Sequence, residues 1–140
     1  MTAEFSLAVH ALVYLLRKGT VVSSGELAEN ICTNPARVRK VMAKLHRAGL
    51  VDSFRGKGSG YQTRPDSAGL PLDRVLSALK EEPVTVNWRS GSIDKKCLLA
   101  SGMGEIMDGL CANMNTACRR QLEAVTIRDV NERIFSGKRA

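Results

Sequence analysis

The stretch FRGKGSGYQTR, residues 54–64, has the clearest chemical character in the chain. It holds three glycines within five residues, three cations and no carboxylate. Glycine lets a backbone approach a ligand closely, and Lys and Arg side chains bind phosphate oxygens. The stretch therefore predicts contact with phosphate, from a nucleotide or from a nucleic-acid backbone. A nucleotide-binding Walker loop is disfavoured, because Lys57 is followed by Gly58 and not by the Ser or Thr that opens a helix.

Four cysteines are the other residues able to do chemistry. Cys32 precedes a basic segment and Cys97 follows two lysines, and nearby positive charge favours the reactive thiolate. Cys111 and Cys118 lie two helical turns apart, about 10 Å of rise, too far for a disulfide or a shared small cluster. We expect these two to be small apolar residues on a helix seam.

The sequence offers no group of residues typical of an enzyme. It has no Cys-x-x-Cys pair and no general base beside a nucleophile, which disfavours a thiol enzyme. Its two histidines, His10 and His46, lack the neighbouring carboxylates or cysteines typical of a metal site. We therefore expect neither an enzyme nor a metal-binding protein.

Positive charge is concentrated in one part of the chain. Residues 33–64 carry eight cations and one acid, a net charge of +7, and the whole chain of 140 residues also has a net charge of +7. The other 108 residues contain 13 cations and 13 acids. A local excess of this kind is typical of a surface that binds a polyanion, although a solvated basic face without a ligand gives the same pattern.

Three helices are predicted before the glycine-rich stretch. Apolar residues at helical spacing predict a first helix over residues 3–18. Ser23 and Glu26 fit a capping box that opens a short second helix. Asn34 and Pro35 fit the N-cap and first residue of a third helix, whose outer face is basic.

The remaining chain alternates between short and long elements. Segments 50–54 and 61–64 are strand-like and flank the glycines, so they predict a β-hairpin with a basic tip. A fourth helix is expected over 72–80, followed by an irregular stretch over 84–95. From about residue 96 to residue 135 the apolar spacing is helical again.

Three helices and a basic hairpin are the plan of a winged helix-turn-helix protein, in which the third helix enters the major groove. The predicted fold class is mainly α, with a small β-hairpin wing and a long C-terminal dimerisation helix. We expect a DNA-binding region over 1–82, a linker or sensor loop over 83–95, and a dimerisation helix with a tail over 96–140. A second copy of the long helix is the simplest partner for its apolar stripe.

The segment SSGELAENICTNPARVRKVMAKLHRAGLVDSFRGKGSGYQTRP resembles the core of the Rrf-two family of bacterial winged-helix regulators. The family wing typically reads RG-x-GGGY, and here it reads RGKGSGY, with Ser59 replacing one glycine. The family pattern L-x-x-AGLV is matched by LHRAGLV. The resemblance implies a homodimeric DNA-binding repressor whose C-terminal region senses a signal.

The resemblance implies that residues 34–40 enter the major groove and that the hairpin is the wing. Arg37 and Arg39 stand where the family often has an acidic or amide residue, so its target sequence does not carry over. Together with the charge pattern, the predicted DNA-binding residues are Asn34, Arg37, Arg39, Lys40, Lys44, Arg47, Arg55, Lys57, Tyr61 and Arg64.

The cysteines decide what signal is expected. Cluster-binding members of the family carry three close cysteines before the long helix, whereas this chain has only Cys97 there, so we expect no cofactor. Other members respond to oxidants through thiols. We expect redox sensing by Cys32 and Cys97, through a reversible disulfide between Cys32 of one subunit and Cys97 of the other. The alternative is two unreactive thiols in a reducing cytoplasm.

The sequence thus favours a dimeric transcriptional regulator, in the first place a repressor, that binds a palindromic operator in double-stranded DNA. A cytoplasmic location is expected, because no signal peptide and no apolar run of about 20 residues is present, so a membrane partner is not expected. The alternatives are a regulator that depends on an iron–sulfur cluster or on a small ligand, for example near Trp88. A non-specific nucleic-acid-binding or adaptor protein is the alternative from another class.

Overall fold

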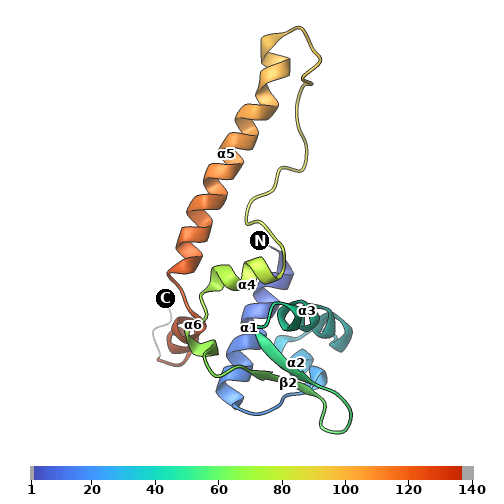
Figure 1. Ribbon diagram of the computed structural model, residues 1–140, viewed down its shortest axis with the longest axis vertical. Helices are drawn as coiled ribbons and strands as arrows, with labels where there is room; N and C mark the ends of the chain where they lie inside the picture. Colours follow the sequence, from blue (N-terminus) through green and yellow to red (C-terminus); the bar gives the residue numbers. More distant parts are fainter. Residues whose placement is uncertain (1, 137–140) are drawn as a thin grey trace.

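The computed structural model describes residues 2–136. In this part of the chain a small body carries a long projecting arm, which is α5 with the linker beside it (Figure 1). The elements in chain order are α1 (Ala3–Lys18), α2 (Ser24–Ile31), α3 (Pro35–Arg47), β1 (Val51–Phe54), β2 (Gly60–Thr63), η1 (Ser67–Gly69), α4 (Leu72–Ala78), α5 (Leu98–Glu123) and α6 (Ile127–Phe135). The predicted fold class, mainly α with a two-stranded hairpin, is confirmed.

The core of the body surrounds α1, which contacts α2, α3, α4, α6 and β2. Its small and aliphatic residues recur at threes and fours, and Ala8, Ala11 and Leu12 have no exposed surface. The buried face of α3 has the same spacing, with Val38, Val41, Met42 and Leu45 fully buried. Burial of these stripes, at about 25 cal/mol per Å² of apolar surface, is what holds α3 against α1.

The ends of α2 and α3 follow local signals in the sequence. The Asn34 side-chain oxygen accepts a hydrogen bond from the Arg37 backbone N–H at 2.8 Å, so Asn34 is the N-cap of α3 as predicted. Ser23 caps α2 in the same way through the Glu26 backbone N–H. The predicted capping box is only half formed, because the Glu26 carboxylate instead accepts from the Tyr14 hydroxyl at 2.6 Å.

The hairpin pairs Val51 with Thr63 and Phe54 with Gly60 in antiparallel register. Its second strand is also fixed to the segment before α2, because the Tyr61 and Val22 backbones exchange two hydrogen bonds of 2.8 Å. A Cβ atom on Gly60 would lie 2.3 Å from the Val22 carbonyl oxygen. Only glycine therefore allows this close approach, which anchors the wing to the body.

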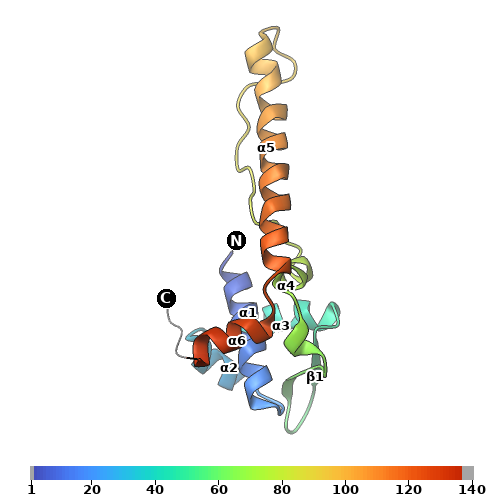
Figure 2. The same cartoon turned by 90° about the vertical axis from the view of Figure 1, so that its left-hand side faces the viewer.

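The prediction of one helical stretch over 96–135 is wrong at one place. The chain forms two helices there, since α5 ends at Glu123 and α6 begins at Ile127. Thr126 and Asp129 form a reciprocal capping box that opens α6 and turns the chain. Ile127 is fully buried, and α6 packs on α1 in the body (Figure 2). The predicted helix over 72–80 is present but ends at Ala78.

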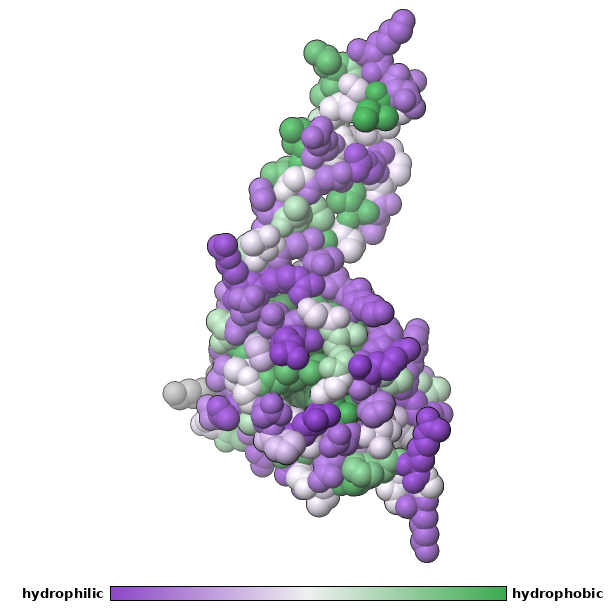
Figure 3. Space-filling model, viewed as in Figure 1, coloured by the Kyte–Doolittle hydropathy of each residue, from purple (hydrophilic) through white to green (hydrophobic). Residues whose placement is uncertain are grey.

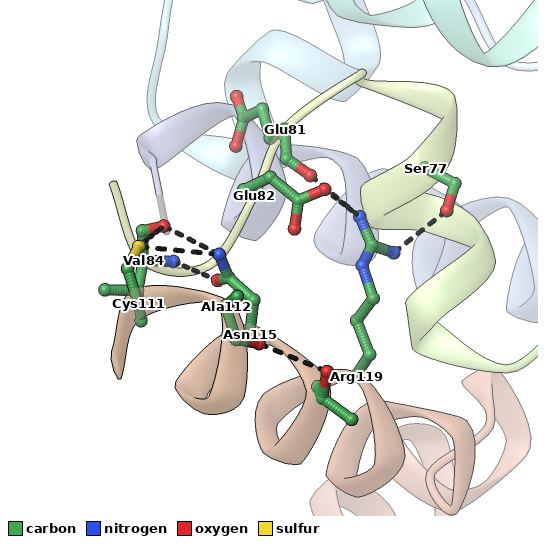
Figure 4. Close-up of polar contacts among 9 residues, drawn as sticks. Ser77, Glu81, Glu82, Val84, Cys111, Ala112, Asn115 and Arg119 are labelled. Carbon is green, nitrogen blue, oxygen red and sulfur yellow. Dashed lines mark hydrogen bonds and ion pairs between the residues drawn. The ribbon is translucent and has the colours of Figure 1, made fainter. Parts of the chain in front are cut away.

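The linker after α4 runs along α5 without a helix or strand over residues 84–95, as predicted. Asn115 of α5 holds its start, because this side chain accepts from the Val84 N–H at 2.8 Å and donates to the Val84 carbonyl at 3.0 Å (Figure 4). The Cys111 thiol donates to the same carbonyl. Farther along, the Arg89 guanidinium pairs with Asp108.

No helix within residues 2–136 combines the length and the apolar character that a membrane crossing requires.

Candidate nucleic-acid interface

The outer face of α3 is a row of exposed cations. Val38, Val41, Met42 and Leu45 form the buried inner face, and the cations of α3 lie at the positions around them. Arg37, Arg39 and Arg47 are all exposed. The N-cap Asn34 is also exposed and lies at the start of the helix, where a reading helix presents its side chains to base edges.

Side chains of α3 and the hairpin share a hollow of about 570 Å³. Three of the predicted cations, Arg39, Arg47 and Arg55, line it. His46 and Tyr61 also contribute to the lining. The third helix and the wing therefore present one continuous basic surface, as binding to two neighbouring grooves of a duplex requires.

The tip of the wing is open to solvent. Arg55 and Lys57 are both exposed, and Gly56 and Gly58 have φ values of +82° and +79°. These left-handed conformations favour glycine and make the tight turn of the tip. The tip therefore carries two cations on a backbone that has no bulky side chain between them.

Two predicted cations of α3 already have an acidic partner within the chain. The Lys44 ammonium lies 2.8 Å from one carboxylate oxygen of Glu4 in α1, and Lys40 lies 3.7 Å from the other. The hydrogen bond from Lys44 lowers the pKa of Glu4 below its ordinary value. Lys44 is half-buried, so it ties α3 to α1, whereas Lys40 remains largely exposed.

The predicted residues in and just after β2, Tyr61 and Arg64, make more contacts within the protein than the residues of the wing tip. Arg64 lies 3.7 Å from Asp52 on the paired strand, and both side chains are about half exposed. Tyr61 is half-buried against the core, and this burial raises the pKa of its phenol. The Tyr61 ring thus supports the hairpin, and it also lines the basic hollow.

Glu4 and Ser24 contact predicted cations of this surface but are missing from the sequence-based set. Glu4 lies far before Lys40 in the chain, and no local pattern indicates that it reaches α3. Ser24, the first residue of α2, accepts a hydrogen bond from the Arg39 guanidinium at 3.4 Å. The Ser23–Glu26 spacing places Ser24 at a helix start, but only the packing of α2 on α3 brings it to Arg39.

The two predicted redox cysteines are both exposed. Cys32 is the C-cap of α2 with φ +65°, and its sulfur lies 3.8 Å from the Glu29 carbonyl, so the thiol acts as a donor toward α2. Cys97 is the N-cap of α5. The end of α2 lies in the body and the start of α5 at the far end of the arm, so one chain does not bring the two together (Figure 1).

Three helices, of which the third is basic, followed by an antiparallel hairpin define the winged helix-turn-helix DNA-binding proteins. Residues 1–133 match the family described as "Rrf2: Iron-dependent Transcriptional regulator". The chain belongs to the Rrf2 family of transcriptional regulators. This match confirms the family resemblance seen in the sequence. Proteins of this family are DNA-binding regulators and not enzymes, so the expected functional class is confirmed as well.

Relatives agree with this assignment. An Azotobacter vinelandii protein provisionally named as an HTH-type transcriptional regulator is 32% identical over 81 residues, 58% of this chain. The chain spans 46% of that relative's own length. A Lactobacillus plantarum protein, provisionally named as a transcriptional regulator, has a structure with a TM-score of 0.83 at 25% identity, covering 96% of this chain and 91% of that one. The Bacillus subtilis global cysteine regulator CymR has the same fold, with a TM-score of 0.67, 18% identity and coverage of 94% and 95%.

The family description mentions iron, and an iron ion or cluster needs several ligands close together. Within residues 2–136 no three His, Cys, Asp or Glu side chains gather in a way that could hold a metal ion. Cys97 is at the far end of the arm, whereas the Cys111 thiol donates to the Val84 carbonyl under the linker. The residues of one described chain therefore do not fit such a group.

Proposed function

We propose that this protein is a cytoplasmic, homodimeric transcriptional repressor that binds a palindromic operator in double-stranded DNA. One observation carries the proposal: cations of α3 and of the wing line a single exposed hollow. Exposed residues at the start of α3, Asn34 and Arg37 among them, would read bases, and Arg55 and Lys57 would bind phosphates. A palindromic operator matches the two-fold symmetry of a dimer.

The surface of α5 supports the dimer. Its large apolar side chains are open to solvent along most of the helix, and Figure 3 shows apolar residues at intervals along the arm. They are Leu98, Leu99, Ile106, Met107, Leu110 and Met114, whose exposed fractions run from 46% to 87%. A monomer rarely leaves so long an apolar stripe exposed to water. Packing against α5 of a second subunit would bury it.

The proposed signal is oxidation of Cys32 and Cys97. Both thiols are exposed, and because Cys32 lies in the body and Cys97 at the far end of the arm, a bridge between subunits is the pairing we propose. Hydrogen peroxide would accept two electrons from the two thiols; its O–O bond would break, an S–S bond would form, and the products would be one disulfide and two water molecules. The bridge would join the turn before α3 to the tip of the partner's arm, and would thereby change the spacing of the two reading helices.

The test is mass analysis under non-reducing conditions before and after mild peroxide, with operator binding measured on the same samples. We expect a covalent dimer that loses its operator and regains it with a thiol reductant. Cys32→Ser and Cys97→Ser should each bind DNA normally and ignore peroxide, whereas Cys118→Ser should behave as the wild type. If oxidation leaves operator binding unchanged, the proposed redox switch is contradicted, whereas the proposal of DNA binding still stands.

A non-specific nucleic-acid-binding protein is the second candidate, because the basic surface alone would bind any duplex. Binding to an operator fragment and to a random duplex of equal length at the same salt concentration separates the two. A preference of about a thousandfold or more is expected for a specific regulator. Equal affinity would contradict the repressor proposal.

A further inference from the structure

A second hollow, of about 700 Å³, lies away from the basic surface, between α1, α6 and the end of α2. These elements lie next to one another in the body (Figure 2). Its lining is mostly apolar and includes Val9 and Val13 of α1 and Val130 and Ile134 of α6. The volume is within the range of about 300–1,000 Å³ that is typical of small-molecule sites.

The described residues that line the hollow include two cations, Arg17 and Lys18, and no carboxylate. Arg17 is exposed, and its guanidinium lies 3.4 Å over the ring of Phe135 and donates to the Asn131 side chain at 3.4 Å. Among residues 2–136 no carboxylate forms an ion pair with Arg17. Its neighbour Lys18, by contrast, is paired with Glu26 at 3.2 Å.

The geometry points to a binding site for a small amphipathic organic anion, with an aromatic or branched apolar body and a carboxylate or sulfonate head. The body would fill the apolar hollow between α1 and α6. The head would meet Arg17, whose guanidinium lies over the Phe135 ring and has N–H donors in addition to the one that Asn131 accepts. This inference goes beyond the proposed redox switch and does not depend on it.

The site is connected to the DNA-binding elements through α1. Tyr14, which lines the hollow, donates to Glu26 of α2 at 2.6 Å, and His10 lies 2.7 Å from Asn30 at the end of the same helix. A ligand that prefers one position of α1 relative to α2 would therefore shift the helix pair that supports α3.

The test uses two fluorescent probes on the full chain without DNA. 1-Anilinonaphthalene-8-sulfonate has an apolar body and an anionic head, and N-phenyl-1-naphthylamine is its neutral counterpart. We expect Arg17→Gln to weaken binding of the sulfonate about tenfold, as for the loss of one charge-assisted hydrogen bond, and Arg17→Glu to weaken it further. Binding of the neutral probe should stay within about twofold.

Arg120→Gln on α5 is the matched control and should leave both probes unchanged, and circular dichroism checks that all variants fold. The inference is overturned if Arg17→Gln leaves sulfonate binding unchanged, or if it weakens both probes equally. It is also overturned if the wild type binds neither probe, which is the result expected when a partner subunit covers the hollow. None of these results bears on operator binding, so the proposed function is tested separately.

Discussion

Lys44 shows that a cation on the basic helix α3 can stabilise the fold. Its position on α3 fits the predicted basic face, but its ammonium is 2.8 Å from Glu4 and its side chain is only 27% exposed. The hydrogen bond thus joins the start of α1 to the last turn of α3. Lys44 therefore has less freedom to reach a phosphate than the exposed Arg47 beside it.

Glu4→Gln should lower the free energy of unfolding by about 0.5 kcal/mol at pH 7, a small value because solvent screens the ion pairs. The pKa of Glu4 is lowered in the folded protein, so the stabilisation is present above the ordinary value of 4.5 and is lost as the pH falls through the lowered value. Urea unfolding at pH 7 and at a pH well below 4.5 measures this.

Glu29→Gln is the control, because Glu29 is exposed and forms no ion pair among the described residues. It should change stability little at either pH. A loss of stability in Glu4→Gln that persists undiminished in acid would mean that the ion pairs to Lys40 and Lys44 are not its source.

Arg55 and Arg64 should differ in their contribution to DNA binding. Arg55 is exposed on the wing tip, whereas Arg64 is paired with Asp52. Arg55→Ala should reduce affinity for every duplex alike and lower the slope of log affinity against log salt by about one, as expected for the loss of one phosphate contact. Arg64→Ala should have the smaller effect. Equal salt slopes for Arg55→Ala and the wild type would contradict the wing contact.

At the scale of elements, the hairpin depends on one glycine. Gly60→Ala would bring a methyl group within 2.3 Å of the Val22 carbonyl, and the strand would have to leave the body. We expect a loss of stability of about 2–4 kcal/mol from this clash together with the broken bridge. Chemical unfolding measures it.

Gly58→Ala is the matched control, since Gly58 also has a positive φ but a methyl group there would meet no atom within 4 Å. It should lose only the conformational cost of about 1 kcal/mol. If the two variants were equally stable, the approach of β2 to Val22 would not be what fixes the wing.

Elements whose ends carry local signals could be predicted from the sequence. Asn34 and Pro35 mark the start of α3, and Gly49 follows its end, because caps are formed by residues within one turn. The boundary at Thr126 also has a local signal, the Thr-x-x-Asp spacing, but the apolar spacing continues across it. Because the apolar residues keep helical spacing on both sides of Thr126, their pattern does not indicate the turn between α5 and α6.

Contacts between distant elements could not be predicted in the same way. The sequence spacing does not indicate that Glu26 turns to Tyr14 and away from its own N-cap, since this choice depends on how α2 packs on α1. The hollow beside α6 likewise exists only because α6 returns to the body. Trp88, which the sequence suggested as a core or interface anchor with a nearby small-ligand site as the alternative, is 78% exposed on the linker.

For the whole molecule, the exposed apolar stripe of α5 predicts the assembly. Leu110→Asp places a charge in the stripe and should shift the proposed dimer toward monomer, weakening association by about a hundredfold or more. Sedimentation at several protein concentrations measures this. Asn113→Asp adds the same charge at a polar position of α5 and should keep the dimer. A dimeric Leu110→Asp protein would mean that another surface joins the subunits.

The end of the arm returns to the body beside the start of α4. Leu72 at the start of α4 donates its backbone N–H to Val125 at 2.9 Å, and Ile127 donates to Leu70 at 3.0 Å. These bonds close the body without the arm. The segments before α4 and after α5 are thus bonded directly to each other, so the length of the arm between them can change without separating these two segments.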